Sequence, residues 1–272
     1  MYINTPYNYT GSKFKILDQI LPFFDYSKDE FVDLFTGGGS VYTNVVDKYN
    51  KIIVNDIIED LIMIHKELVN SDDIIVKTKD LCPNKADKIG YLELRKSYNE
   101  CKSPEKLWAL MLCCQNNMMR FNKSFVFNQT WGNRSWNPNT DKKITNFINH
   151  IRPYKNNIEF KSMHYRNIEI KENTFFYIDP PYLETEAGYN CYYDKKDDLN
   201  LYDFLNEINL RGSSYMISGV MGEHKNGKRS KLIDRLIDDG MNYKIIECDY
   251  EKVARNKNTK NSKEIIIFNY EL

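Results

Sequence analysis

The sequence of 272 residues has little of what metal-binding, secreted and membrane proteins need. Its six cysteines form no C-x-x-C pair and it has only four histidines, so neither a zinc framework nor a disulfide scaffold is indicated. No apolar run reaches the roughly 18 residues of a membrane span, and residues 1–13 lack the apolar core of a signal peptide. We therefore expect a protein without metal, outside the membrane, in a reducing cytoplasm.

The charge of the chain is balanced. The chain has 38 Lys and Arg residues and 38 Asp and Glu residues, and hydrophobic residues make up 42% of it. This composition supplies a core and excludes a charge-expanded disordered chain. A net charge of +0 argues against a globally basic nucleic-acid binder, although charge clustered on one face does not show in the sum. Composition therefore leaves the partner open.

Short β-branched and aromatic segments alternate with amphipathic segments over most of the chain. This alternation predicts a mostly parallel sheet covered by helices. We expect strands at residues 31–35, 51–55, 158–160, 175–179, 215–218, 243–248 and 264–269. We expect helices at residues 13–24, 40–49, 57–69, 199–209 and 231–239. The predicted fold class is α/β, with a doubly wound sheet.

The alternation breaks between residues 71 and 156. Helical periodicity at 88–102 and 104–117 is followed by a segment rich in Asn, Trp and Gly from 121 to 139. We interpret 71–156 as a mainly helical inserted domain. Residues 1–70 and 157–272 then form the α/β domain.

A glycine-rich loop, Gly37 to Gly39, follows an apolar strand and precedes a helix. Without a Cβ atom, the main chain can approach a ligand closely there. A dinucleotide-binding loop needs a further glycine where this chain has Tyr42, which disfavours NAD. Asp56 follows the next apolar run, where a carboxylate can accept the hydroxyls of a ribose. We predict an adenosine-containing cofactor; a glycine turn followed by a helix-capping Asp is the alternative.

The segment FFYIDPPY leads from a buried strand into a stiff turn, because Pro180 and Pro181 fix their own φ and Pro180 restricts Asp179. The Asp179 carboxylate and the Pro180 carbonyl can accept both hydrogens of a planar amine such as that of adenine. This frees the nitrogen lone pair, while Tyr182 stacks on the ring. A structural turn is the alternative. A cytosine-ring methylase is disfavoured, since no Pro-Cys pair occurs.

Taken in order, YTGSK (9–13), FTGGGSV (35–41), NDI (55–57), an insertion and DPPY (179–182) resemble the Dam-type adenine-specific DNA methyltransferases, including bacteriophage members. The resemblance covers nearly the whole chain. It implies a Rossmann-like methyltransferase sheet in a catalytic domain, with a target-recognition domain at 71–156. It also implies methyl transfer from S-adenosylmethionine to N6 of adenine in double-stranded DNA by base flipping, often within GATC. The location it implies is a bacterial or phage-infected cell.

The same resemblance assigns the cofactor contacts. They are Tyr9, Lys13, Phe35, Gly37, Gly39, Asp56, His164, Tyr165 and Asp179. Asp56 resembles the acid on the cofactor ribose, and Asp179 the residue shared by cofactor and target amine. Phe35 and the glycines are expected at the methionine end, with His164 and Tyr165 near the cofactor adenine. Lys13 and the lone His164 have structural roles as their alternatives.

The segment NNMMRFNKSFVFNQTWGNRSW resembles the family's recognition segment, in which a helix end and a β-hairpin enter the major groove. Arg120 and Arg134 align with base-contacting arginines of phage members, and a guanidinium can grip O6 and N7 of guanine. Phosphate contacts or surface ion pairs are the alternative. The residues expected to contact DNA are Asn8, Gln115, Asn116, Arg120, Arg134 and Tyr189.

Two other functions stay open. The chain could methylate RNA or a protein amide, or it could be a catalytically inactive DNA-binding protein of the same fold. The inserted segment favours DNA over the first, and the intact glycine loop, Asp56 and DPPY favour activity over the second. The oligomeric state is open between a monomer and a weak dimer on DNA.

Overall fold

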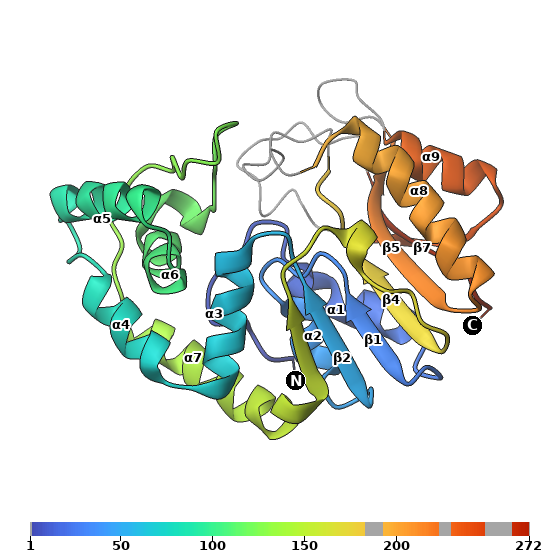
Figure 1. Cartoon of the computed structure of the whole chain (residues 1–272), viewed down its shortest axis with the longest axis horizontal. Coiled ribbons are helices and arrows are strands. Elements are labelled where there is room, and N and C mark those ends of the chain that lie inside the picture. Colours follow the sequence, from blue (N-terminus) through green and yellow to red (C-terminus); the bar gives the residue numbers. More distant parts are fainter. Residues whose placement is uncertain (1, 183–192, 223–229, 248–262, 272) are drawn as a thin grey trace.

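The computed structural model describes residues 2–182, 193–222, 230–247 and 263–271. At its centre is a seven-stranded sheet with the order β3-β2-β1-β4-β5-β7-β6 (Figure 1). The strands are β1 (Glu30–Asp33), β2 (Lys51–Asn55), β3 (Ile158–Lys161), β4 (Thr174–Ile178), β5 (Ser214–Met221), β6 (Asn242–Ile246) and β7 (Lys263–Phe268). β7 runs antiparallel to both neighbours and the other pairs are parallel. All seven predicted strands are confirmed, with small shifts at their ends.

Helices cover both faces of this sheet. The helices packed on the sheet are α1 (Leu17–Ile20), α2 (Ser40–Val45), α3 (Glu59–Asn70), α8 (Lys195–Leu210) and α9 (Lys231–Asp238). The inserted segment adds α4 (Asp73–Leu81), α5 (Lys88–Glu100), α6 (Pro104–Cys113) and α7 (Pro138–Ile151). Alternate strand residues point to opposite faces, so Phe31 packs with α1–α3 whereas Val32 packs with α8 and α9. The doubly wound α/β class is therefore confirmed. None of the helices described is long and apolar enough to cross a membrane.

Several helices differ from the periodicity of the sequence. The helix expected at 13–24 is divided into a 3-10 turn (Lys13–Ile16), α1 and a second 3-10 turn (Leu21–Phe23). Pro22, which lacks an N–H, stands in the first turn of the last piece. The helices α4 and α7 were not predicted. The start of α7 carries a readable signal, because Asn137 caps the helix and Pro138 opens it.

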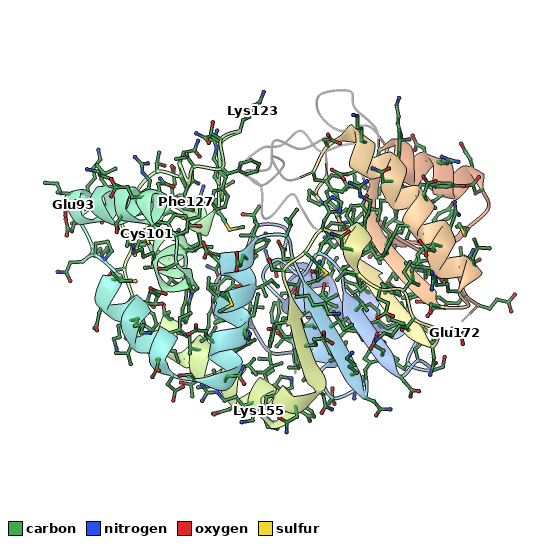
Figure 2. All side chains as sticks on the ribbon, viewed as in Figure 1. Glu93, Cys101, Lys123, Phe127, Lys155 and Glu172 are labelled. Atoms are coloured by element: carbon green, nitrogen blue, oxygen red, sulfur yellow. The ribbon has the colours of Figure 1, made fainter. Side chains whose placement is uncertain are left out.

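The expected β-hairpin of the insertion consists of two isolated antiparallel bridges, Cys114 to Trp131 and Phe121 to Phe127, instead of a regular ladder. Positive φ angles explain this difference, since Asn116 (59°) and Phe125 (57°) have left-handed backbone that extended strands do not adopt. Lys123, near the tip, points outward (Figure 2).

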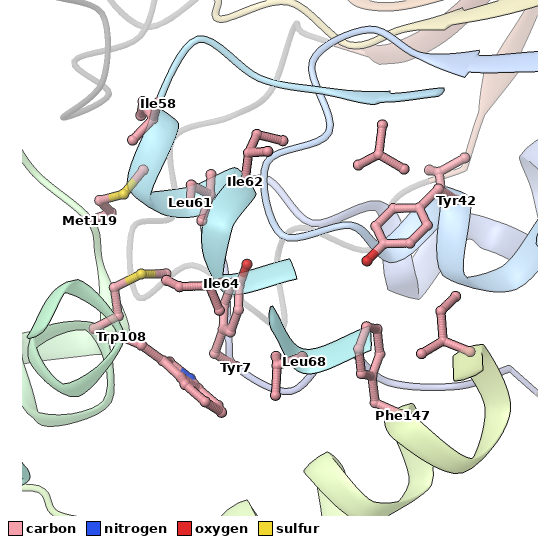
Figure 3. Packing of buried hydrophobic residues seen from close by; sticks show 14 of the residues in the cluster. Tyr7, Tyr42, Ile58, Leu61, Ile62, Ile64, Leu68, Trp108, Met119 and Phe147 are labelled. Carbon is pink, nitrogen blue, oxygen red and sulfur yellow. The ribbon is translucent and has the colours of Figure 1, made fainter. Parts of the chain in front are cut away.

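One apolar cluster runs from the sheet into the insertion. Tyr7 from the N-terminal segment, Leu68 from α3, Trp108 from α6 and Phe147 from α7 are all buried in it (Figure 3). The ring centroids of Tyr7 and Trp108 lie 6.4 Å apart. The insertion therefore shares its core with α3 and the N-terminal segment, which fixes its position beside the sheet.

This shared core predicts that the insertion and the sheet unfold together. All three tryptophans, Trp108, Trp131 and Trp136, lie within 71–156, so their fluorescence follows the insertion while far-UV circular dichroism follows the whole chain. We expect Phe147→Ala to cost about 3–5 kcal/mol of stability and to move both urea transitions together. A fluorescence transition that precedes the dichroism transition would show that the insertion unfolds alone.

Candidate active site

The carboxyl ends of β1, β2 and β4 border a cavity of about 380 Å³. This volume lies in the range of small-molecule sites. Its wall includes most of the predicted cofactor and catalytic residues: Tyr9, Lys13, Phe35, Gly37, Asp56, His164, Tyr165, Asp179, Pro180 and Tyr182. The fold thus brings the N-terminal motif, the glycine loop and the D-P-P-Y turn to one place.

A buried ion pair dominates the charge of this cavity. Asp179 follows β4, and the Nζ atom of Lys13 lies 2.7 Å and 2.8 Å from its two carboxylate oxygens. Burial raises the pKa of Asp179, and the Lys13 ammonium opposes this rise. Burial alone would lower the pKa of Lys13, but its acidic neighbours, led by Asp179, raise it well above its ordinary value. Lys13 therefore stays protonated and is not a general base.

Asp56 joins the end of β2 to the glycine loop. Its Oδ2 accepts the backbone N–H of Gly37 at 3.0 Å, and its Oδ1 accepts that of Ile58 at 3.0 Å. Burial raises the pKa of Asp56 to about 6. The ring of Tyr9 lies so close to Gly37 that a Cβ atom there would be 2.7 Å from it. Gly39 does not border the cavity in the described structure; it is the N-cap residue that precedes α2, with a φ of 77°.

His65, which the sequence analysis missed, holds the glycine loop through a hydrogen bond to its main chain. Its side chain is fully buried, with Nε2 3.0 Å from the Gly37 carbonyl and Nδ1 2.9 Å from the Tyr42 hydroxyl. A carbonyl can only accept, so we assign the proton to Nε2 and the lone pair to Nδ1. Burial lowers the pKa of His65 to about 4, so it is neutral at pH 7.

The opposite wall of the cavity is aromatic. The ring of Phe35 lies 5.5 Å from that of Tyr165 and 6.1 Å from that of Tyr193, and His164 lies 4.6 Å from Tyr165. Nε2 of His164 lies 3.3 Å from a carboxylate oxygen of Asp197. Aromatic rings around a slot of this kind suit a planar heterocycle.

A second cavity, of about 430 Å³, lies between the N-terminal segment and the insertion. Asn117 holds its two sides together, because its Oδ1 accepts hydrogen bonds from Arg134 and, at 3.3 Å, from Asn8. Lys143 donates to Asn8 at 2.8 Å, and Lys85 completes a basic border. Two of the predicted DNA contacts, Asn8 and Arg134, thus meet here.

The other predicted DNA contacts are placed differently. Gln115, Asn116 and Arg120 are exposed on the same segment of the insertion but do not border the second cavity. Tyr189 lies outside the described residues.

Further residues of the first cavity escaped the sequence analysis. Asp33 ends β1, and its Oδ2 accepts from the Thr36 hydroxyl at 3.1 Å and from the Tyr42 N–H at 3.2 Å. Burial raises the pKa of Asp33 to about 7. An acid between an apolar strand and a glycine loop is a signal that could have been read. Met118 reaches the cavity from the insertion, and no local pattern announces it. In the parts described, no group of three or more His, Cys, Asp or Glu side chains is placed to hold a metal.

The chain belongs to the family of D12 class N6 adenine-specific DNA methyltransferases, whose model matches residues 9–261. It is 31% identical, over 99% of its length, to the modification methylase StsI of Streptococcus sanguinis. It is also 31% identical over 99% of its length to the type II methyltransferase M.FokI of Planomicrobium okeanokoites. The chain spans 43% of the length of each of these two relatives. The expected adenine-specific family is confirmed, whereas the Dam-type subgroup and GATC stay predictions.

The pKa of His65 predicts a pH dependence of stability. Below pH 6.5 the unfolded chain binds a proton at this histidine, whereas the folded chain does not until about pH 4. Acid therefore favours the unfolded state, and the contribution of His65 to the free energy of unfolding falls by about 3 kcal/mol between these pH values. We expect the stability difference between wild type and His65→Gln, measured by urea unfolding, to shrink by that amount from pH 7 to pH 4. Because both proteins share the same carboxylates, curves that stay parallel would contradict the assignment.

Proposed function

We propose that the protein transfers a methyl group from S-adenosylmethionine to the exocyclic N6 amino group of adenine in double-stranded DNA. The observation that carries this proposal is the single cavity in which the D-P-P-Y turn meets the glycine loop and Asp56. Membership of the adenine-specific family supports it, as does similarity to a modification methylase and a type II methyltransferase.

The cavity fits the cofactor. Asp56, buried at the end of β2, is placed to accept ribose hydroxyls, since each of its oxygens has a further lone pair beyond the backbone N–H it accepts. His164 and Tyr165, whose rings lie 4.6 Å apart, would flank the cofactor adenine, and Phe35 beside Tyr165 would lie toward the methionine end. Gly37 and Gly38 line the cavity, and because they lack a Cβ the Tyr9 side chain can pack directly against their main chain. S-adenosylmethionine would supply an activated methyl group on its sulfonium sulfur.

The D-P-P-Y turn would position the target amine. The Asp179 carboxylate and the Pro180 carbonyl accept its two hydrogens, so that its lone pair is free to attack the methyl carbon in line. The N–C bond forms as the S–C bond breaks, and the nitrogen then releases a proton. Tyr182 stacks on the adenine ring. A base within a duplex cannot reach a turn at the base of a cavity, so the adenine must be flipped out.

The insertion would read the DNA. Arg134, Lys85 and Lys143 give the second cavity a positive border, and Met118 reaches from the same insertion into the first cavity. DNA held by the insertion would thus lie next to the place where the flipped base is needed. We propose GATC as the recognition sequence, with Arg134 reading a guanine and Arg120 as the second candidate.

The first test is methylation of DNA from a methylation-free host by the purified chain with labelled cofactor, followed by sequencing of modified bases. We expect Asp179→Ala to lower the transfer rate by at least about a hundredfold, since the loss of an acceptor costs about 3 kcal/mol or more of transition-state stabilisation. The variant should stay folded, because Lys13 keeps a second carboxylate, Glu264, at 3.4 Å.

The control for this variant is Asp72→Ala. Asp72 forms an exposed ion pair with Arg152 and does not border the cavity. Its loss should leave the rate within about twofold of wild type. Near-normal turnover by Asp179→Ala, or modified bases other than adenine, would overturn the proposal.

The recognition sequence is tested with GATC and its single-base variants at two salt concentrations. We expect Arg134→Ala to lose about 1–3 kcal/mol of discrimination at one guanine-containing position, because Asn117 orients the guanidinium. Loss of a phosphate contact would instead weaken binding to all sequences alike. It would also reduce the slope of log affinity against log salt concentration by about one. Arg120→Ala, the second candidate on the same segment, is measured in the same assay and sorted by the same criterion. A wild type that ignores GATC would overturn the target sequence.

A further inference from the structure

A second carboxylate lies in the cluster formed by Lys13, Asp179 and Tyr182. Glu264, the second residue of β7, is only 3% exposed, although the four residues that follow it in the strand are apolar. Its Oε1 lies 3.4 Å from Nζ of Lys13 and accepts a hydrogen bond from the Tyr182 hydroxyl at 3.1 Å. A strand at the far end of the sequence thus brings a negative charge to the D-P-P-Y turn.

Two donors are shared between two carboxylates in this cluster. The Tyr182 hydroxyl lies 3.1 Å from Asp179 and 3.1 Å from Glu264, but its single hydrogen serves one acceptor at a time. Lys13 binds both oxygens of Asp179 and also lies within ion-pair distance of Glu264. The Tyr182 hydroxyl is thus equally far from both carboxylates, and Nζ of Lys13 lies 3.4 Å from Glu264 against 2.7 Å from Asp179. Each donor therefore has a second acceptor close by.

This arrangement bears on the proposed function. An Asp179 carboxylate that is held at both oxygens by an ammonium is a weaker acceptor for a neutral amine than a free carboxylate. The adenine amine therefore competes with Lys13 and Tyr182 for the same oxygens. A neighbouring acceptor that takes these donors removes the competition.

We propose that Glu264 is a positioning residue that takes Lys13 and Tyr182 over from Asp179 when the target amine binds. This inference rests on the proposed methyl transfer. Lys13 lies within ion-pair distance of both carboxylates, so a small shift of its ammonium toward Glu264 leaves the Asp179 oxygens open to the amine. The Glu264 carboxylate also raises the pKa of Asp179 by repulsion, which makes Asp179 a better acceptor.

The test compares Glu264→Gln, which keeps the shape and removes the charge, with Glu30→Gln. Glu30 is a buried, ion-paired glutamate at the amino end of β1, outside the cavity. We expect Glu264→Gln to lower the single-turnover methylation rate at least about tenfold, with the Kd for S-adenosylmethionine within about twofold of wild type. Glu30→Gln should keep both values. Glu264→Asp, which keeps the charge but moves it away from Lys13, should lower the rate to an intermediate value.

A second measurement needs no DNA. Carbon-13 NMR of the Asp179 carboxyl should show a lower pKa in Glu264→Gln than in wild type, because a repelling charge is lost and Lys13 turns wholly to Asp179. An unchanged pKa, an unchanged rate, or a loss of rate matched by an equal loss of cofactor affinity would overturn the role of Glu264. A wild type without methylation activity would instead refute the proposed function. The NMR measurement would then still test whether Glu264 acts on Asp179.

Discussion

The structure of the site depends on how a buried ammonium is satisfied. Lys13 is almost completely enclosed, and an unpaired charge there would cost several kcal/mol. Its partners, Asp179 after β4 and Glu264 in β7, come from distant parts of the sequence. The N-terminal segment, the D-P-P-Y turn and the last strand must therefore meet for the charge to be compensated. The pairing of this one charge therefore requires both the correct strand order and the assembled site.

The second constraint is the apolar core that the insertion shares with the sheet. Tyr7 contacts Trp108 of the insertion on one side, while its hydroxyl lies 2.8 Å from His65 on the other. His65 in turn supports the Gly37 carbonyl. The same short stretch of packed side chains therefore supports the glycine loop and the wall of the second cavity. This packing keeps the two cavities in fixed relation, which the proposed transfer to a base on bound DNA would require.

Sequence alone was sufficient for features that consecutive residues determine. The seven strands were predicted because β-branched and aromatic runs have a local signature. The D-P-P-Y turn and the glycine loop were recognised because proline and glycine restrict or free the backbone at their own positions. That these motifs face one ligand followed from the rule that open α/β sheets bind at the carboxyl ends of their strands. This rule placed Asp56 and Asp179 in one site from the sequence, whereas Lys13 joined them only through the resemblance of YTGSK to the family motif.

Only the tertiary structure decided the contacts between distant residues. Glu264 and His65 look like ordinary members of a strand and a helix, and their roles come from partners that local sequence does not specify. The insertion's hairpin became two isolated bridges because left-handed residues interrupt it, and Asn8 met Arg134 through Asn117, more than 100 residues from Asn8. Local patterns report backbone preference and burial. Which buried polar groups pair is settled by packing, since each must find a partner when water is excluded.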